Sequence, residues 1–111
     1  MSITYSSTIT MEITAADNRL TILLNPDGNS DTFTIYTFDA NFDVNPGATI
    51  DLTHCLNAAG GTGKLVFIGS NFGGPGKFNI NIKTDGNSAF TIDEGLAPWE
   101  SKQWNVDISK S

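Results

Sequence analysis

The chain has 111 residues, with twelve acidic and six basic side chains and a net charge of −6. A chain of this length forms one domain, and burial of about 65% of its unfolded surface gives a core that needs no metal or disulfide crosslinks. The negative field repels phosphate groups, and the basic residues are scattered singly along the chain, so we expect no nucleic-acid partner. We therefore predict a single domain over residues 1–111.

The apolar and polar content indicates strands and turns. The uncharged polar fraction contains 13 Thr, 11 Asn, 11 Gly and 9 Ser, residue types that favour strands and tight turns. The longest uninterrupted apolar run is Leu65–Ile68, so we expect neither a transmembrane segment nor a signal peptide. This pattern leaves two localisations open, the cytoplasm and export by a signal-free route.

Taken in chain order, the elements begin with a long alternation. From Ile3 to Ile13 most odd positions are apolar and the even ones polar, which predicts one amphipathic strand. The same criteria predict seven further strands and no helix, over Arg19–Leu24, Thr32–Phe38, Ala48–His54, Lys64–Ile68, Lys77–Thr84, Ala89–Ile92 and Gln103–Ser109.

Turn residues separate these strands. Pro, Gly and Asn occur together in Asn25–Gly28 and Asn45–Gly47, and Gly with Asn in Asp85–Asn87, where a fixed or positive φ closes a tight turn. Short, evenly spaced strands of this kind predict an all-β fold, a single-domain antiparallel β-sandwich or jelly roll of about eight strands.

Two segments contain residue types that occur in catalytic or phosphate-binding sites. His54 is the only histidine and precedes Cys55, the only cysteine, on a predicted strand whose neighbouring residues point to opposite faces. A Cys–His dyad is therefore not expected, and Cys55 is interpreted as a reduced, packed thiol. The glycine-rich stretch before Lys64 lacks the Ser or Thr that follows the Lys of a phosphate loop, and is interpreted as a connection. The chain is predicted to have no catalytic residues.

Two runs have the spacing of calcium ligands. Side-chain oxygens alternate in Asp27-x-Asn29-x-Asp31 and in Asp39-x-Asn41-x-Asp43-x-Asn45, as in calcium loops. Neither run has the Gly and the bidentate Glu that the EF-hand pattern requires. We predict turns that are capped by their own Asn and Asp side chains, and no metal. The alternative is an irregular calcium site built from both loops, with ligands Asp27, Asp31, Asp39 and Asp43.

The aromatic residues suggest where a ligand binds. Trp104 alternates with Val106 and Ile108, which predicts a core position, whereas Trp99 lies outside any alternation, close to Asp93, Glu94 and Gln103. Trp99 either stacks on a sugar ring, with these polar groups on the hydroxyls, or covers the end of the sandwich as a lid.

A second glycine loop carries Asn71 and Phe72, which are further ligand candidates. Two roles are open for Phe72. We favour a Phe72 that pins the loop to the core over one that is displayed at the surface.

In composition the chain resembles the compact lectins and aegerolysin-like lipid binders of fungi and bacteria, which are small, acidic, all-β and rich in Thr, Asn and Gly. The leading hypothesis is a non-enzymatic, lectin-like module for a carbohydrate or glycoconjugate, with homo-oligomerisation as a way to multiply weak sites. One alternative is a self-assembling structural subunit of a phage, appendage or crystal, in which the first strand pairs between subunits. Another is a lipid-directed cytolytic or defence component.

Overall fold

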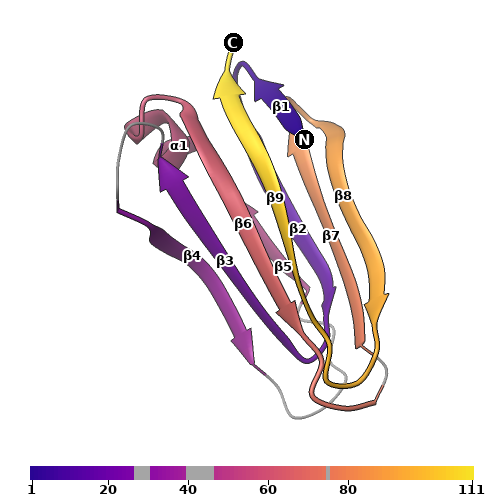
Figure 1. The fold of residues 1–111 in the computed structure, drawn as a ribbon. Coiled ribbons are helices and arrows are strands. Elements are labelled where there is room, and N and C mark those ends of the chain that lie inside the picture. The colour runs from indigo at the N-terminus through magenta and orange to yellow at the C-terminus, as the bar shows by residue number, and fades with distance from the viewer. Residues whose placement is uncertain (27–30, 40–46, 75) are drawn as a thin grey trace.

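The computed structural model describes residues 1–26, 31–39, 47–74 and 76–111. Two sheets pack face to face, with strand orders β1-β9-β6-β3-β4 and β5-β2-β7-β8 (Figure 1). The elements are β1 (Ser2–Tyr5), β2 (Ile9–Ala16), β3 (Arg19–Pro26), β4 (Phe33–Asp39), β5 (Ala48–Asp51), α1 (Thr53–Ala58), β6 (Thr62–Ser70), β7 (Gly76–Thr84), β8 (Asn87–Leu96) and β9 (Ser101–Lys110). The predicted all-β sandwich is confirmed.

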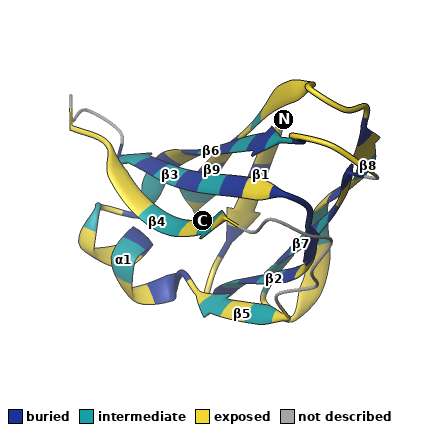
Figure 2. Ribbon diagram, turned by 90° about the horizontal axis from the view of Figure 1, so that it is seen from below, coloured by how far each residue is buried: buried dark blue, intermediate teal, exposed yellow. Residues whose placement is uncertain are grey.

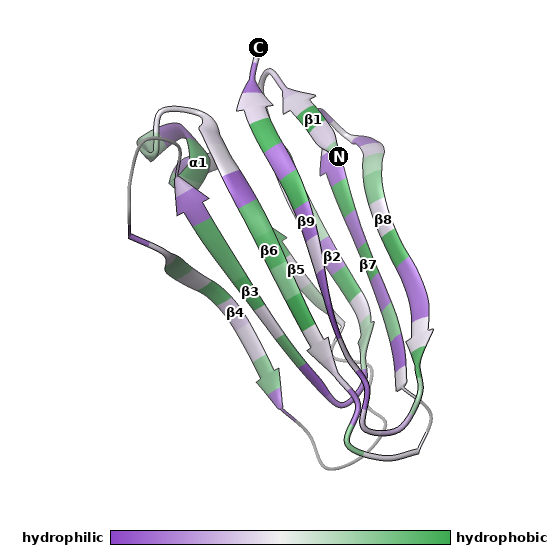
Figure 3. Cartoon of the chain, viewed as in Figure 1, coloured by the Kyte–Doolittle hydropathy of each residue, from purple (hydrophilic) through white to green (hydrophobic). Residues whose placement is uncertain are grey.

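The core lies between the sheets and is built from alternate residues of each strand. Buried and exposed positions alternate along the ribbons in Figure 2, and the hydropathy alternates with them in Figure 3. The largest buried side chains come from both sheets and from α1: Tyr5, Phe67, Phe78, Ile9, Met11, Ile13, Leu20, Ile22, Leu52, Leu56, Leu65 and Ile80. Trp104 packs partly buried against this core, on the inward side that its alternation predicted.

The predicted single strand from Ile3 to Ile13 is wrong, because the chain changes sheets within it. β1 pairs in parallel with β9 in the five-stranded sheet, whereas β2 lies between β5 and β7 in the four-stranded sheet. The apolar side chains on both sides of the switch point into the same core, so the alternation continues although the strand does not. Within the described residues this division gives nine strands in place of about eight, and β1–β9 is a parallel pair where the other strand pairs there are antiparallel.

One carboxylate holds the chain at this change of sheets. Asp85 Oδ1 accepts hydrogen bonds from the amides of Ser7 and Thr8, at 2.7 and 3.0 Å, and Oδ2 accepts the amide of Ser6 at 2.9 Å. Asp85 and Gly86 form the β7–β8 hairpin turn with positive φ angles of 52° and 83°, as the Asp-Gly sequence predicted. The three backbone donors lower the Asp85 pKa from 3.8 to about 2.

We predict that Asp85→Asn lowers the melting temperature, since an amide offers one acceptor oxygen where the carboxylate offers two. A lowered pKa stabilises the fold above the unfolded value of 3.8, and this contribution is lost as the pH falls through about 2. The difference in melting temperature between wild type and variant should therefore be full at neutral pH and should shrink as the pH falls toward 2. Asp93→Asn is the control. A difference that persists unchanged at the lowest pH would contradict this role.

The predicted strand over Ala48–His54 ends early, and a helix follows that sequence alternation did not predict. The side chain of Asp51 accepts the amide of Thr53 at 2.9 Å, which starts a helical turn after only four strand residues. Leu52 and Leu56, four residues apart, are both buried and close the sandwich at this end. The Thr53 hydroxyl bonds to the backbone of Ile9 and so joins α1 to β2.

Candidate functional site

The described connections β2–β3, β6–β7 and β8–β9 meet at one end of the sandwich, which we call the loop end (Figure 1). The Asn71 amide donates to Glu100 O at 2.9 Å, and the Trp99 amide donates to Asn71 O at 2.6 Å. Asn18 Oδ1 accepts the amide of Phe72 at 2.8 Å. Hydrogen bonds therefore join three connections that are far apart in sequence.

Asn71 organises the loop end and is not available to a ligand. It is 1% exposed, and its Nδ2 donates to the carbonyl oxygens of Gly74 and Leu96, both at 2.9 Å. Its Oδ1 accepts the amide of Gly73 at 3.0 Å. Both amide hydrogens are therefore used inside the protein, and the predicted ligand role of Asn71 is replaced by a structural one.

Phe72 and Trp99 are displayed together at the surface. Trp99 is 81% exposed and Phe72 45% exposed, and their rings meet edge to face with centroids 6.3 Å apart. The expectation that Phe72 pins its loop to the core is wrong, because this side chain contacts Trp99. With this exposure Trp99 cannot act as a lid over the core either.

The backbone of Trp99 has a φ of 64°, in the left-handed region that side chains other than Gly rarely adopt. The short connection from β8 to β9 imposes this angle: Glu100 N donates to Ala97 O, and Ala97 N donates to Glu100 Oε1, each at 3.1 Å. Strained backbone of this kind concentrates at functional positions. It holds the indole of Trp99 outward, away from the sandwich.

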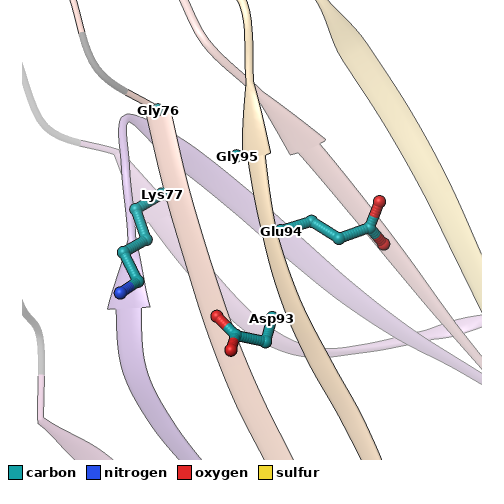
Figure 4. Close-up of a pocket in the computed structure, with 5 residues that line it drawn as sticks. All are labelled: Gly76, Lys77, Asp93, Glu94 and Gly95. Carbon is teal, nitrogen blue, oxygen red and sulfur yellow. The ribbon is translucent and has the colours of Figure 1, made fainter.

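Close to the loop end, an open depression of roughly 390 Å³ is lined by Gly76, Lys77, Asp93, Glu94 and Gly95 (Figure 4). Gly95 leaves it hollow, since a Cβ there would meet only the carbonyl oxygen of Gly76, at 3.7 Å. Asp93 turns its carboxylate toward the Lys77 side, whereas Glu94 points away (Figure 4). Among the described residues, Lys77 and Asp93 have no ion-pair partner, so both charges remain open to a ligand.

The side chain of Glu94 joins the two sheets and points away from the depression. Its Oε1 accepts a hydrogen bond from the Lys102 ammonium, and its Oε2 accepts one from Trp104 Nε1, so β8 is bound to β9. The hydrogen bond from Lys102, followed by that from Trp104, lowers the Glu94 pKa below its ordinary value. Both carboxylate oxygens are engaged, which gives Glu94 a structural role.

Gln103 lies elsewhere. It is exposed on β9, and its Nε2 donates to Asn105 Oδ1 at 3.0 Å. Its position alternates with that of the inward Trp104, so it lies on the outer face of the five-stranded sheet, and the depression is on the other sheet. Of the six ligand candidates from the sequence, the structure leaves Trp99, Phe72 and Asp93 exposed at or beside the loop end.

Lys77 and Gly95 were missed by sequence reasoning. The strand alternation of β7 does place Lys77 outward, on the side opposite the buried Phe78. Its neighbour across the sheet is Gly95, and Asp93 lies two pairs further along, opposite Asn79. This register depends on a bulge in the β7–β8 hairpin, and no residue pattern in the sequence predicts that bulge.

The potential metal ligands are only partly described. Asp27 and Asp43 lie outside the described residues. β4 spans about 20 Å between Phe33 and Asp39, and Asp31 lies two residues before its start. Asp31 and Asp39 are therefore at opposite ends of β4. These two carboxylates are too far apart to bind the same ion. Within the described ranges, no group of three or more His, Cys, Asp or Glu residues is placed to hold a metal ion.

His54 and Cys55 lie on α1, where the sequence predicted the end of a strand. His54 is exposed, and the half-buried Cys55 donates its S–H to Leu52 O at 3.2 Å. Burial raises the Cys55 pKa above 9.0, which keeps the thiol protonated at neutral pH. This thiol is therefore poorly suited to act as a nucleophile.

The chain was compared with protein-family models, with curated proteins and with solved structures, and none of them matches it. In the part of the chain that the structure describes, no helix is long and apolar enough to cross a membrane.

We predict that Cys55 in the native protein reacts more slowly with a thiol reagent than it does in the denatured chain at neutral pH, because burial and the raised pKa reduce the thiolate fraction. The native rate should continue to rise above pH 9.0, where the rate of the denatured chain levels off. A colorimetric thiol assay at several pH values measures both rates. A native rate equal to the denatured rate at neutral pH would show the thiol to be accessible and activated.

Proposed function

We propose that the chain is a non-enzymatic, lectin-like module that binds glycans at its loop end. The observation that carries this proposal is the exposed Trp99, held outward by its backbone and paired edge to face with Phe72. An exposed indole offers a flat apolar surface for the C–H face of a sugar ring. The sequence hypothesis of a stacking Trp99 is thereby preferred to the lid.

The neighbouring depression supplies polar groups for sugar hydroxyls. Asp93 provides a carboxylate acceptor and Lys77 an ammonium donor, with the Gly95 backbone between them. Gly95 and Trp99 are four residues apart, so their Cα atoms lie within about 14 Å. We infer that one oligosaccharide contacts both features, with one ring on Trp99 and another over Gly95.

The exposed Trp99 and Phe72 would also suit the interface of a lipid bilayer, where an aromatic ring with a polar edge is favoured. A net charge of −6 opposes anionic membranes, so this alternative requires neutral headgroups. Vesicles of phosphatidylcholine therefore form a separate arm of the experiment described next.

We predict that Trp99→Ala abolishes binding to the ligands that the wild-type protein selects on a glycan array, measured by calorimetry. Ala suffers the same strained φ as Trp, and the indole is exposed, so the free energy of unfolding should change by no more than about 0.5 kcal/mol. Trp99→Phe should retain part of the affinity, because a smaller ring still stacks.

Phe33→Ala is the matched control. Phe33 is 50% exposed and lies near the opposite end of the sandwich, opposite Leu24 of β3. This variant should bind glycans as the wild type does. Wild-type affinity in Trp99→Ala would remove the site from the loop end, and binding to neutral vesicles without any glycan ligand would favour the lipid alternative.

A further inference from the structure

Of the sheet edges in the described chain, β4 has the least protection against pairing, since a single bulge at Ile35 is all that interrupts it. Of the four edge strands, β1 and β5 have only four residues each. β8 carries Glu94, a charge directed between the sheets, which discourages a further strand. β4 has seven residues, no Pro, and a single charge, Asp39, at its end. Its outer edge is therefore suited to accept another strand.

The sequence of β4 is close to a palindrome. Phe33-Thr34-Ile35-Tyr36-Thr37-Phe38 reads Phe, Thr, aliphatic or aromatic, Thr, Phe from either end. In an antiparallel pair of two such strands, each Phe and each Thr lies opposite a residue of its own type, and Ile35 lies opposite Tyr36. Aromatic, aromatic with β-branched, and Thr–Thr pairs are the favourable cross-strand pairs. This self-complementarity points to a second copy of the chain as the partner.

Because of a bulge, corresponding residues in the two halves of this palindrome lie on the same face of the sheet. In a regular strand Phe33 and Phe38, five positions apart, would point to opposite faces. The β3–β4 register shifts between Ile22 and Leu23, so Ile35 is an extra residue in β4. Phe33 and Phe38 consequently lie opposite Leu24 and Leu20, whose side chains are both buried.

The two threonines are in phase as well. Thr34 and Thr37 lie opposite Leu23 and Thr21, which alternate with the buried residues of β3 and so face outward. A two-fold axis perpendicular to the sheet keeps each side chain on its own face. The bulge thus makes this palindromic register geometrically compatible with a symmetric antiparallel pair.

We propose that two copies of the chain pair antiparallel through β4 and form a symmetric dimer. Phe33 lies opposite the partner's Phe38, Thr34 opposite the partner's Thr37, and Ile35 opposite the partner's Tyr36. The two five-stranded sheets become one continuous ten-stranded sheet. Phe33, which is 50% exposed in a single chain, gains an aromatic neighbour.

The two-fold axis sets the direction of the loop ends. Antiparallel β4 strands run in opposite directions, so the loop ends of the two copies point away from each other. A dimer of this geometry bridges two separate ligand-bearing surfaces and does not bind one surface twice. The pairing itself does not rest on the proposed glycan binding, and its test uses mass alone.

The test is sedimentation of the wild type and of two charge variants at concentrations up to about 1 mM. In Thr34→Lys/Thr37→Lys each new ammonium lies opposite another across the axis. The dissociation constant of the dimer should therefore rise about tenfold or more. In Thr34→Lys/Thr37→Glu opposite charges meet at both places, and the dimer should return. The first variant also lowers the net negative charge, which by itself favours association, so a loss is specific to the pairing.

Thr4→Lys/Thr49→Lys is the control, because it adds the same charge to exposed positions of β1 and β5. This variant should dimerise as the wild type does. A wild type that stays monomeric throughout the range, a dimer that survives two lysines on β4, or a control that dissociates equally would overturn the proposal.

Circular dichroism is used to test whether each variant is folded. Should the double lysine variant not fold, hydrogen exchange of the wild type decides the matter. Amides of residues 33–39 should become better protected as the concentration rises, and unchanged protection would overturn the pairing.

Discussion

The buried side chain of Asn71 is the contact on which the loop end depends. An amide group surrounded by apolar residues is stable only where its donors and acceptor are satisfied, and Asn71 meets this need with Gly73, Gly74 and Leu96. Its backbone carbonyl oxygen also accepts a hydrogen bond from the Trp99 amide, and its backbone amide donates one to Glu100 O. A single polar residue thus fixes two loops relative to each other, and the exposed Trp99–Phe72 pair follows from that arrangement.

The opposite end of the molecule uses the same physical device in a different place. There the carboxylate of Asp85 accepts hydrogen bonds from the amides of Ser6, Ser7 and Thr8. At these residues the chain changes sheets and the backbone has no strand partner. Backbone donors that leave a sheet must find other acceptors. Side-chain acceptors at both ends therefore satisfy backbone donors that have no strand partner.

Much of the fold was predictable from residue patterns. Alternation identified the apolar face of the segment from Ile3 to Ile13 and the inward positions of Trp104, Val106 and Ile108, and the Asp85-Gly86 turn was predicted from its two residues. The change of sheets between β1 and β2 could not be seen, because inward residues continue their period on both sides of it. The helix α1 was missed because Asp51 and Thr53 start it with a local hydrogen bond inside a segment of strand-like composition.

The candidate site was predicted less completely. Trp99 was identified because it lies outside any alternation, but this property left both an exposed position and a lid open, and only the structure shows that it is exposed. Asp93 and Glu94, adjacent in sequence, could not be assigned to faces, because the Asp85-Gly86 turn alone would pair Lys77 with Glu94. The unpaired Ala89 shifts the register by one residue, so that Lys77 pairs with Gly95, Asp93 faces outward and Glu94 turns toward β9. A one-residue slip reverses the faces of every residue beyond it.

The sequence by itself therefore determined the alternation of apolar residues along the strands and the tight turn at Asp85-Gly86, and it singled out Trp99 as lying outside any alternation. These properties depend on neighbours along the chain. Tertiary structure alone decided the change of sheets at Ser6–Thr8, the meeting of the loops around Asn71, and the bulges at Ile35 and Ala89 that set which side chains share a face. Hydrogen-bond register between distant strands is set by the packing of the whole sandwich, and local residue patterns do not contain it.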